Sequence, residues 1–317
     1  MSHSSRHNAL AWPYPRHKSF EAHLRASNTT WFEEHNYQVN KRMPYLLDHW
    51  ENWPRNIILP EVVDYIQAER KRRSELHIGF PLHKYIHHGL SSQAMLFNLV
   101  GPIVVNGDLS PLKLAFEIKD IAWPPEPITP IFEVEDRKIF NEDSGQPTSI
   151  DFVIKGHNGV RSLFVEAKLV EREFGGCSVF NGGDCDSRNP TGNFNRCYLH
   201  YLGRKYWNLM EKYGFLSGPA GQSPICPLAV YYQFFRELIF ALESGGDFVL
   251  LYDQRNPSFF CGEDQDDRGL MPFLLTFVPE EIKGRIHSIS IQQVVTGHKE
   301  LGGFPWVDEF EKKYGLS

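Results

Sequence analysis

The chain has 317 residues, and its 41% hydrophobic and 14% aromatic content is enough for a packed core in one large domain or two small ones. Its net charge of −6 argues against a general nucleic-acid coat protein, which would usually be basic, but allows an enzyme whose site needs acidic residues. Neither a secretory signal nor an apolar run long enough to cross a membrane is recognisable, so we expect a cytoplasmic protein without membrane contact.

The first eighty residues are expected to form a helical N-terminal extension. Residues 1–16 are polar and rich in proline, which predicts a poorly ordered arm. A helical pattern covers residues 19–49, and Pro60 suits the first turn of another helix. That helix ends in the basic run 70–73, which can either contact phosphates or complement the negative end of the helix dipole.

An apolar helix is expected next. Ser91 or Ser92 can cap its N-terminus, and Gly101-Pro102 is expected to end it. Gln93 is the only polar side chain in its first turns. The composition indicates a buried helix.

Two strands are predicted after this helix, over residues 112–119 and 131–135, because apolar and polar side chains alternate there. Glu133 and Glu135 share one face of the second strand. Either of them can reach a metal in the site described next, or both can face solvent.

The stretch 148–170 has the pattern of a β-hairpin with an Asn158-Gly159 turn. Glu166 and Lys168 share a face because they are two apart on a strand, and antiparallel pairing can bring Asp151 beside them. Two carboxylates can bind a hard divalent cation, which polarises a phosphoryl oxygen. A neighbouring lysine can orient or deprotonate a bound water, or stabilise charge in the transition state. The pattern therefore predicts phosphodiester hydrolysis.

The same residues carry a resemblance. Asp151, fourteen further residues and then Glu166-Ala167-Lys168 resemble the signature of the PD-(D/E)XK, or restriction-endonuclease-like, nuclease superfamily, with Ile150 in place of the usual proline. The resemblance implies that Asp151, Glu166 and the backbone of Ala167 hold Mg²⁺ or Mn²⁺, and that Lys168 is catalytic. Many members add a Glu from the first core helix. This helix has none, so either Gln93 takes that place or the third acidic residue comes from elsewhere.

Two longer segments, 87–103 and 231–238, are similar to a group of uncharacterised bacterial proteins labelled as restriction endonucleases. This likeness implies a role in bacterial defence or restriction.

Residues 171–226 are expected to be an insertion in the core. Within it, residues 194–213 have a helical pattern in which cations alternate with aromatic side chains. Three or four soft ligands suggest a structural Zn²⁺, with buried free cysteines as the alternative. The candidate ligands are Cys177, Cys185, Cys197 and either Cys226 or His200.

A buried helix is predicted from Pro227 up to Gly245-Gly246, followed at once by a strand. Its polar side chains Gln233, Arg236 and Glu237 share one face. In the superfamily that the chain resembles, a Gln on the second helix often lies beside the catalytic site, and Gln233 matches that place. The alternative is a buried Gln whose hydrogen bonds go to the backbone.

The part after residue 257 carries no obvious chemical signal. We expect an acidic loop at 261–267, a helix over 279–298 and a docked C-terminal helix in the tail.

We therefore predict an α/β protein with a restriction-endonuclease-like αβββαβ core, a mixed sheet flanked by helices. Residues 1–80 form the helical N-terminal extension, 81–256 the nuclease core with the insertion 171–226, and 257–317 a helical extension packed on the core. The predicted function is metal-dependent nucleic-acid hydrolysis, with DNA favoured over RNA. The predicted catalytic residues are Asp151, Glu166, Lys168 and Gln233.

Two other interpretations remain open at this point. One is a nuclease-like scaffold that binds nucleic acid or a protein partner without cutting, and the other is a ribonuclease, because the hydrolytic chemistry is the same for both nucleic acids. A homodimer or another protein partner is also compatible with the sequence.

Overall fold

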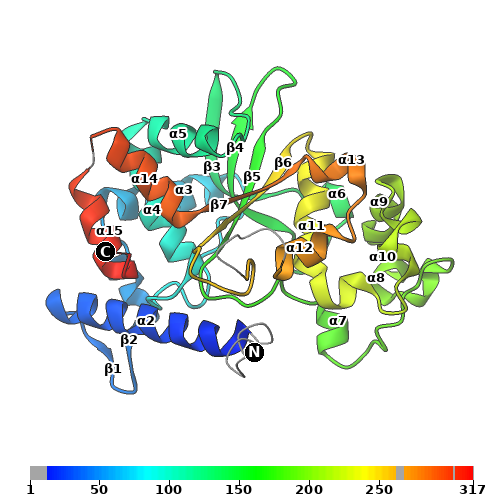
Figure 1. Ribbon diagram of the computed structural model, residues 1–317, viewed down its shortest axis with the longest axis horizontal. Coiled ribbons are helices and arrows are strands. Elements are labelled where there is room, and N and C mark those ends of the chain that lie inside the picture. The colour runs from blue at the N-terminus through cyan, green and yellow to red at the C-terminus, as the bar shows by residue number, and fades with distance from the viewer. Residues whose placement is uncertain (1–12, 262–267, 303, 317) are drawn as a thin grey trace, which may run out of the picture.

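The computed structural model describes residues 13–261, 268–302 and 304–316. A five-stranded mixed sheet in the order β3-β4-β5-β6-β7 lies at the centre, with helices on both faces (Figure 1). β3, β4 and β5 run antiparallel to one another, whereas β5, β6 and β7 run parallel. The strands are β3 (Ile128–Glu135), β4 (Ser149–Gly156), β5 (Leu163–Lys168), β6 (Asp247–Tyr252) and β7 (Ile286–Ser290).

Two helices complete the αβββαβ core. α4 (Ser92–Asn106) comes before β3, and α11 (Pro227–Glu243) joins β5 to β6. They lie on opposite sides of the sheet, with α4 among the helices on the left of Figure 1 and α11 on the right. The predicted α/β fold class with an αβββαβ core is therefore confirmed.

Successive apolar side chains of β4 belong to two separate cores, one on each face of the sheet. Phe152 belongs to the core on the α4 side, and Val153 to the core on the α11 side. β5 and β6 are buried along their whole length, as is usual for strands covered on both faces. Ile150 also belongs to the core on the α11 side, so the strict alternation of β4 does not extend to Ile150 and Asp151. The hairpin turn is as predicted, with positive φ at Asn158 and Gly159.

The start of α4 was predicted correctly, but its end was not. The Ser91 hydroxyl accepts a hydrogen bond from the backbone N–H of Ala94 at 3.3 Å. The helix continues past Gly101-Pro102 and ends at Gly107, whose φ is +70°. Gly101 serves packing instead, because a Cβ there would lie 2.6 Å from a methyl group of Val62 on α3 (Pro60–Glu75).

The strand predicted over residues 112–119 is wrong, because this segment forms α5 (Ser110–Ile118). Its buried residues Leu112, Ala115 and Phe116 are spaced i, i+3 and i+4, so the sequence satisfies the helical period as well as the alternating one. Pro111 in the first turn favours the helix. The strand predicted over 131–135 lies within β3 and is confirmed.

The N-terminal part is helical only in places. The pattern predicted as one helix over 19–49 forms α2 (Pro13–Glu34), followed by a small two-stranded sheet. The connecting elements are β1 (Val39–Asn40), β2 (Met43–Leu47) and the 3₁₀ helix η1 (Trp50–Asn56). α3 begins at Pro60 as predicted. Most of the predicted arm over 1–16 lies outside the described residues.

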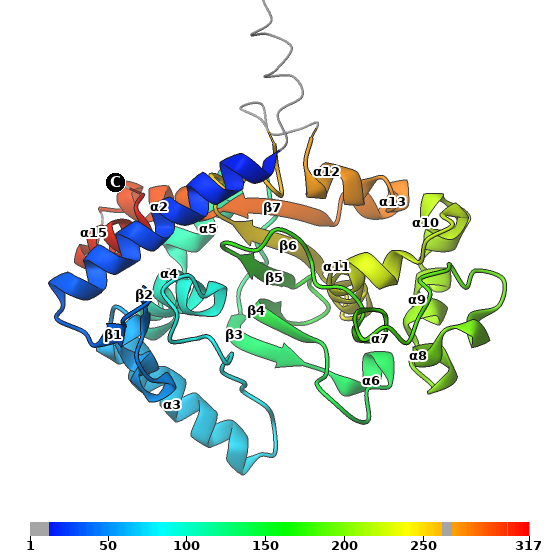
Figure 2. The ribbon, with the colours of Figure 1, turned by 90° about the horizontal axis from the view of Figure 1, so that it is seen from below.

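The C-terminal part adds a strand that the sequence did not predict. The helix predicted over 279–298 is divided into α13 (Glu280–Lys283), β7 and α14 (Ile291–Glu300), because β7 pairs with β6 along the edge of the sheet. The predicted C-terminal helix is present as α15 (Pro305–Tyr314), which packs against α2 (Figure 2). α12 (Leu270–Leu275) precedes α13. Of the predicted acidic loop, only Cys261 lies inside the described residues.

The segment 171–226 consists of short helices that flank α11 (Figure 2). The single helix predicted over 194–213 is wrong, because the chain turns at Gly203, whose φ is +88°. Trp207 anchors this segment in the core on the α11 side. The helices are α7 (Ser178–Asn181), η2 (Phe194–Arg196), α8 (Tyr198–Tyr201), α9 (Tyr206–Lys212), η3 (Phe215–Ser217) and α10 (Pro219–Gln222), and α6 (Arg137–Phe140) lies between β3 and β4.

A search of the described helices finds none with both the length and the apolar character that a membrane span requires.

Candidate active site

The candidate site lies where β4 and β5 separate. The two strands pair from Phe152–Val165 to Ile154–Leu163 and no further toward Asp151. Asp151 bridges the opening, since its Oδ2 accepts a hydrogen bond from the backbone N–H of Ala167 at 2.9 Å. In an extended strand the N–H and C=O of one residue point to the same side. The carbonyl of Ala167 therefore faces the same opening as Asp151.

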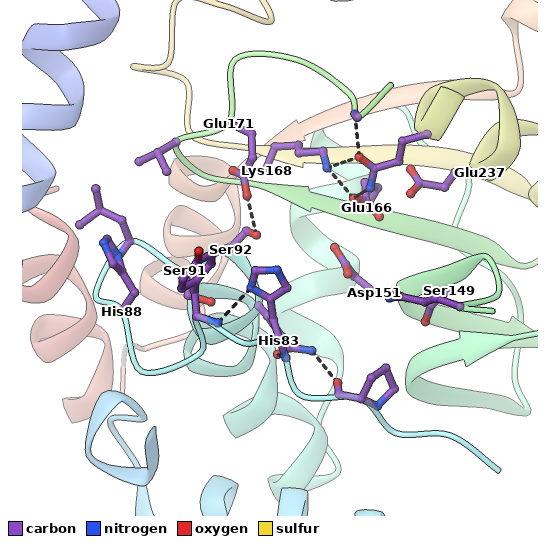
Figure 3. Close-up of a pocket in the computed structure, with 18 of the residues that line it drawn as sticks. His83, His88, Ser91, Ser92, Ser149, Asp151, Glu166, Lys168, Glu171 and Glu237 are labelled. Carbon is purple, nitrogen blue, oxygen red and sulfur yellow. Dashed lines mark hydrogen bonds and ion pairs between the residues drawn. The ribbon is translucent and has the colours of Figure 1, made fainter. Parts of the chain in front are cut away.

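Three of the predicted residues form a closed triangle of hydrogen bonds. Lys168 Nζ donates to Glu166 Oε1 at 2.7 Å and to Gln233 Oε1 at 2.9 Å. Gln233 Nε2 donates to the same Glu166 oxygen at 2.7 Å. α11 delivers Gln233 to the end of β5, and the backbone N–H of Gly175 also donates to its side-chain oxygen. Figure 3 shows Asp151, Glu166 and Lys168 around one opening.

The charges of this cluster are buried. Glu166 is 3% exposed and Lys168 is 5% exposed. Burial disfavours the ammonium of Lys168, but Glu166, Glu237 and Glu171 outweigh it and raise the pKa of Lys168 above its ordinary value. Burial, together with repulsion from Glu166 and Glu133, holds the pKa of Asp151 well above its ordinary value. The site therefore has more negative charge than its lysine balances.

Two further carboxylates belong to this site, although they were not among the predicted catalytic residues. Glu133 is buried on β3, and burial is the main reason why its pKa rises to about 7. Glu237, one turn after Gln233 on α11, is buried and its Oε2 has no hydrogen-bond partner. The sequence contains a signal for each of them. Glu133 is an acidic residue on a predicted strand that precedes Asp151, and Glu237 is a charged residue within a predicted buried helix. Glu135 lies against Gly79 instead.

The cluster lines a cleft of about 1080 Å³ between the α4 and α11 sides of the sheet. The N-terminus of α4 contributes Gln93 and Ser92, and the Ser92 hydroxyl donates to Glu171 Oε1 at 2.8 Å (Figure 3). His83 and Arg236 also reach this cleft. Its volume is at the upper end of the range for ligand pockets, so there is room for a substrate next to the carboxylates.

The donor set suits a hard divalent cation. Mg²⁺ and Mn²⁺ prefer oxygen ligands, and the carboxylates of Asp151 and Glu166 with the carbonyl of Ala167 supply them. The unpartnered buried oxygen of Glu237 supports this fit, since an uncompensated buried carboxylate is costly. No three His, Cys, Asp or Glu side chains of the described residues lie close enough together to form a metal site on their own. Two carboxylates are compatible with an ion that keeps several of its waters.

The cysteines do not form a metal site in the described part of the chain either. All of them are free, and Cys177 and Cys226 are buried. Burial is the main cause that raises the pKa of the Cys226 thiol to about 12. Repulsion from Cys197 and Cys185 raises it further. The structural Zn²⁺ stays a prediction.

Comparison with known proteins gives one family. The sequence matches the model of the family described as "Restriction Endonuclease associating with ARP" over residues 25–315. No curated protein and no solved structure gives a significant match.

Proposed function

The chain belongs to the family described as restriction endonuclease associating with ARP, and we propose that it is a divalent-metal-dependent nuclease that hydrolyses phosphodiester bonds in DNA. The observation that carries the proposal is the meeting of Asp151, Glu166 and Lys168 at the point where β4 and β5 separate. The family name favours DNA as the substrate and a role in bacterial restriction or defence. It also names an association with ARP, so we include that partner in the proposal.

Each residue of the cluster has a role in this reaction. Asp151, Glu166 and the carbonyl of Ala167 hold Mg²⁺ or Mn²⁺, which when bound polarises a phosphoryl oxygen and lowers the pKa of a bound water. Lys168 orients the attacking water and stabilises the negative charge that develops on the phosphate. Gln233 holds Lys168 and Glu166 in their relative positions, because it hydrogen bonds to both.

The test is a cleavage assay with labelled double-stranded DNA, single-stranded DNA and RNA, each with Mg²⁺, Mn²⁺ or EDTA. We expect DNA cleavage that EDTA stops and that Asp151→Asn reduces at least about a hundredfold, since even groups that only hydrogen bond to metal ligands contribute 10- to 100-fold. Asp308→Asn, on the distant helix α15, is the matched control.

The other outcomes identify the alternatives. Cleavage of RNA alone would make the protein a ribonuclease. Nucleic-acid binding without cleavage and without metal binding would favour the non-cutting scaffold. Cleavage that EDTA or Asp151→Asn leaves unchanged would contradict the proposed site.

A further inference from the structure

Glu133 occupies the position opposite Asp151 in the sheet. The residues on either side of it pair with those on either side of Asp151, namely Phe132 with Phe152 and Val134 with Ile150. Glu133 and Asp151 are not themselves one of the regular pairs of this ladder. Glu133 also lines the same cleft as Asp151. A third strand of the sheet therefore brings a carboxylate to the site.

The backbone at Glu133 is in an unusual conformation, which the structure holds from outside the sheet. Its φ is +51°, a value that a non-glycine residue in a strand rarely adopts and that costs about 1–3 kcal/mol. Arg73 on α3 donates to the carbonyl of Glu133 and to the carbonyl of Phe132, each at 2.6 Å. Arg73 is in turn bound by Glu69 at 2.8 Å. One of the basic residues predicted to contact phosphates thus fixes the geometry of β3.

The side chain of Glu133 is held by neutral donors. Gln93 on α4 donates to its Oε1 at 2.6 Å, and the Ser149 hydroxyl donates to its Oε2 at 3.1 Å. The orientation of the Gln93 amide is fixed, because its oxygen accepts the backbone N–H of His83 at 2.8 Å. A carboxylate can accept about four hydrogen bonds, so these two donors leave capacity toward the cleft. Neither donor compensates the charge of Glu133.

A second observation points to a cation in the same place. Glu237, from α11, brings a buried oxygen without a hydrogen-bond partner to the cleft. With Glu21, Glu133, Asp151, Glu166 and Glu171, it makes six buried or part-buried carboxylates that line the same cleft, in which the cations are Lys168, Arg25 and Arg236. Such an excess is costly unless a cation compensates it.

We propose that Glu133 is the third acidic group of the metal centre, that it acts through water bound to the metal, and that Gln93 is its positioning residue. The first core helix then contributes an amide that holds the acid, and the neighbouring strand contributes the acid itself. Action through water agrees with the hydrogen bonds that hold Glu133 to Gln93 and Ser149, and with the absence of a ready-made three-residue site among the described side chains. This inference rests on the proposed function.

The test measures Mn²⁺ binding by titration calorimetry, with no substrate present. We expect Glu133→Gln to weaken Mn²⁺ binding about 10- to 100-fold. This is the range for groups that hydrogen bond to the ligands of a metal rather than to the metal itself. Glu135→Gln, two residues further on β3 and against Gly79 rather than in the cleft, is the matched control and should bind as the wild type does.

A second variant, in which the carboxylate and the amide change places, tests the inference even if Glu133→Gln folds poorly. The double variant Gln93→Glu with Glu133→Gln keeps one carboxylate and one amide at the same contact, so we expect it to recover most of the lost Mn²⁺ affinity. A folded Glu133→Gln variant with wild-type affinity would overturn the inference, as would a folded exchange variant that binds no better than Asp151→Asn.

The failure of this inference is distinguishable from failure of the proposed function. If the wild type binds Mn²⁺ through Asp151 while Glu133→Gln has no effect, only the role of Glu133 is wrong. If the wild type binds no Mn²⁺ at all, the proposed metal-dependent function fails with it.

Discussion

Two buried lysines in this chain have opposite surroundings. Lys313, on α15, is 0% exposed; its Nζ donates to the carbonyl and the side-chain oxygen of Asn56 and lies 3.9 Å from the ring centre of Trp31. Burial alone lowers the pKa of Lys313 well below its ordinary value. At Lys168, the neighbouring carboxylates outweigh burial and raise the pKa. Burial of a lysine alone therefore does not indicate an active site. The carboxylates around Lys168 distinguish it from Lys313.

The carboxylates of the two regions differ in the same way. At the C-terminal end of α15, Asp253 is paired with one guanidinium, since Arg255 donates to its two oxygens at 2.9 and 2.6 Å and also to the carbonyl of Tyr314. Gln292 completes that contact with a hydrogen bond to Asp253 at 2.8 Å. In the cleft, several carboxylates share Lys168. Asp253 is thus paired without a ligand, whereas the cleft holds more carboxylates than Lys168 pairs with, and the proposed cation would compensate that excess.

Among the variants that compare the two networks, the two glutamines should differ most. Gln233→Leu removes the hydrogen bonds to Lys168 and Glu166, so we expect kcat for DNA cleavage to fall about 10- to 100-fold with the fold retained by circular dichroism. Gln292→Leu should leave kcat unchanged and reduce the free energy of unfolding by about 1 kcal/mol. Equal losses of kcat in both variants would remove the distinction between the regions.

The next effect concerns stability in the presence of metal. Mn²⁺ at about a hundred times its dissociation constant should raise the free energy of unfolding by about 2.7 kcal/mol, because it binds only the folded state. Urea unfolding with and without Mn²⁺ measures this gain. Asp151→Asn should lose it, and Lys313→Met should keep it. A gain that persists in Asp151→Asn would place the metal elsewhere.

The smallest effect is a pH dependence of opposite sign at the two lysines. The folded pKa of Lys313 lies below its unfolded value near 10.5, so between the two values the unfolded state binds one more proton and stability rises with pH. The folded pKa of Lys168 lies above that value, so its contribution is complete below pH 10.5 and is lost only as the pH rises through the folded pKa.

Comparison of the wild type with Lys313→Met in urea, at pH 9 and pH 10, just below the unfolded value near 10.5, tests this difference. The wild type should gain up to about 1.4 kcal/mol of unfolding free energy relative to the variant over that interval. Curves that remain parallel at both pH values would show that Lys313 keeps its proton on folding.

The sequence was sufficient for the geometry of the hairpin and its helix. Asp151, Glu166 and Lys168 meet because strand alternation and antiparallel pairing are local rules, and Gln233 meets them because α11 has a clear helical pattern. The sequence named Glu133 and Glu135 as residues that can reach the metal but could not choose between them, since the backbone at Glu133 is held by Arg73, sixty residues earlier in the chain.

The errors in secondary structure have similar causes. The segment of α5 satisfies two periods at once, so its burial against the rest of the core decides between helix and strand. β7 becomes a strand through parallel pairing with β6, a long-range contact that local sequence does not encode. Local patterns thus predicted the central hairpin better than the sheet edge.

The most direct measurement compares Lys168→Met with Lys313→Met in DNA cleavage with Mg²⁺. Both variants remove one buried amino group and keep an apolar chain of similar length. We predict that Lys168→Met loses cleavage by roughly 10²- to 10³-fold, the usual contribution of one donor that stabilises charge in the transition state, while Lys313→Met cleaves at the wild-type rate. Wild-type cleavage by a folded Lys168→Met variant, or equal losses in both variants, would contradict the assignment of the active site.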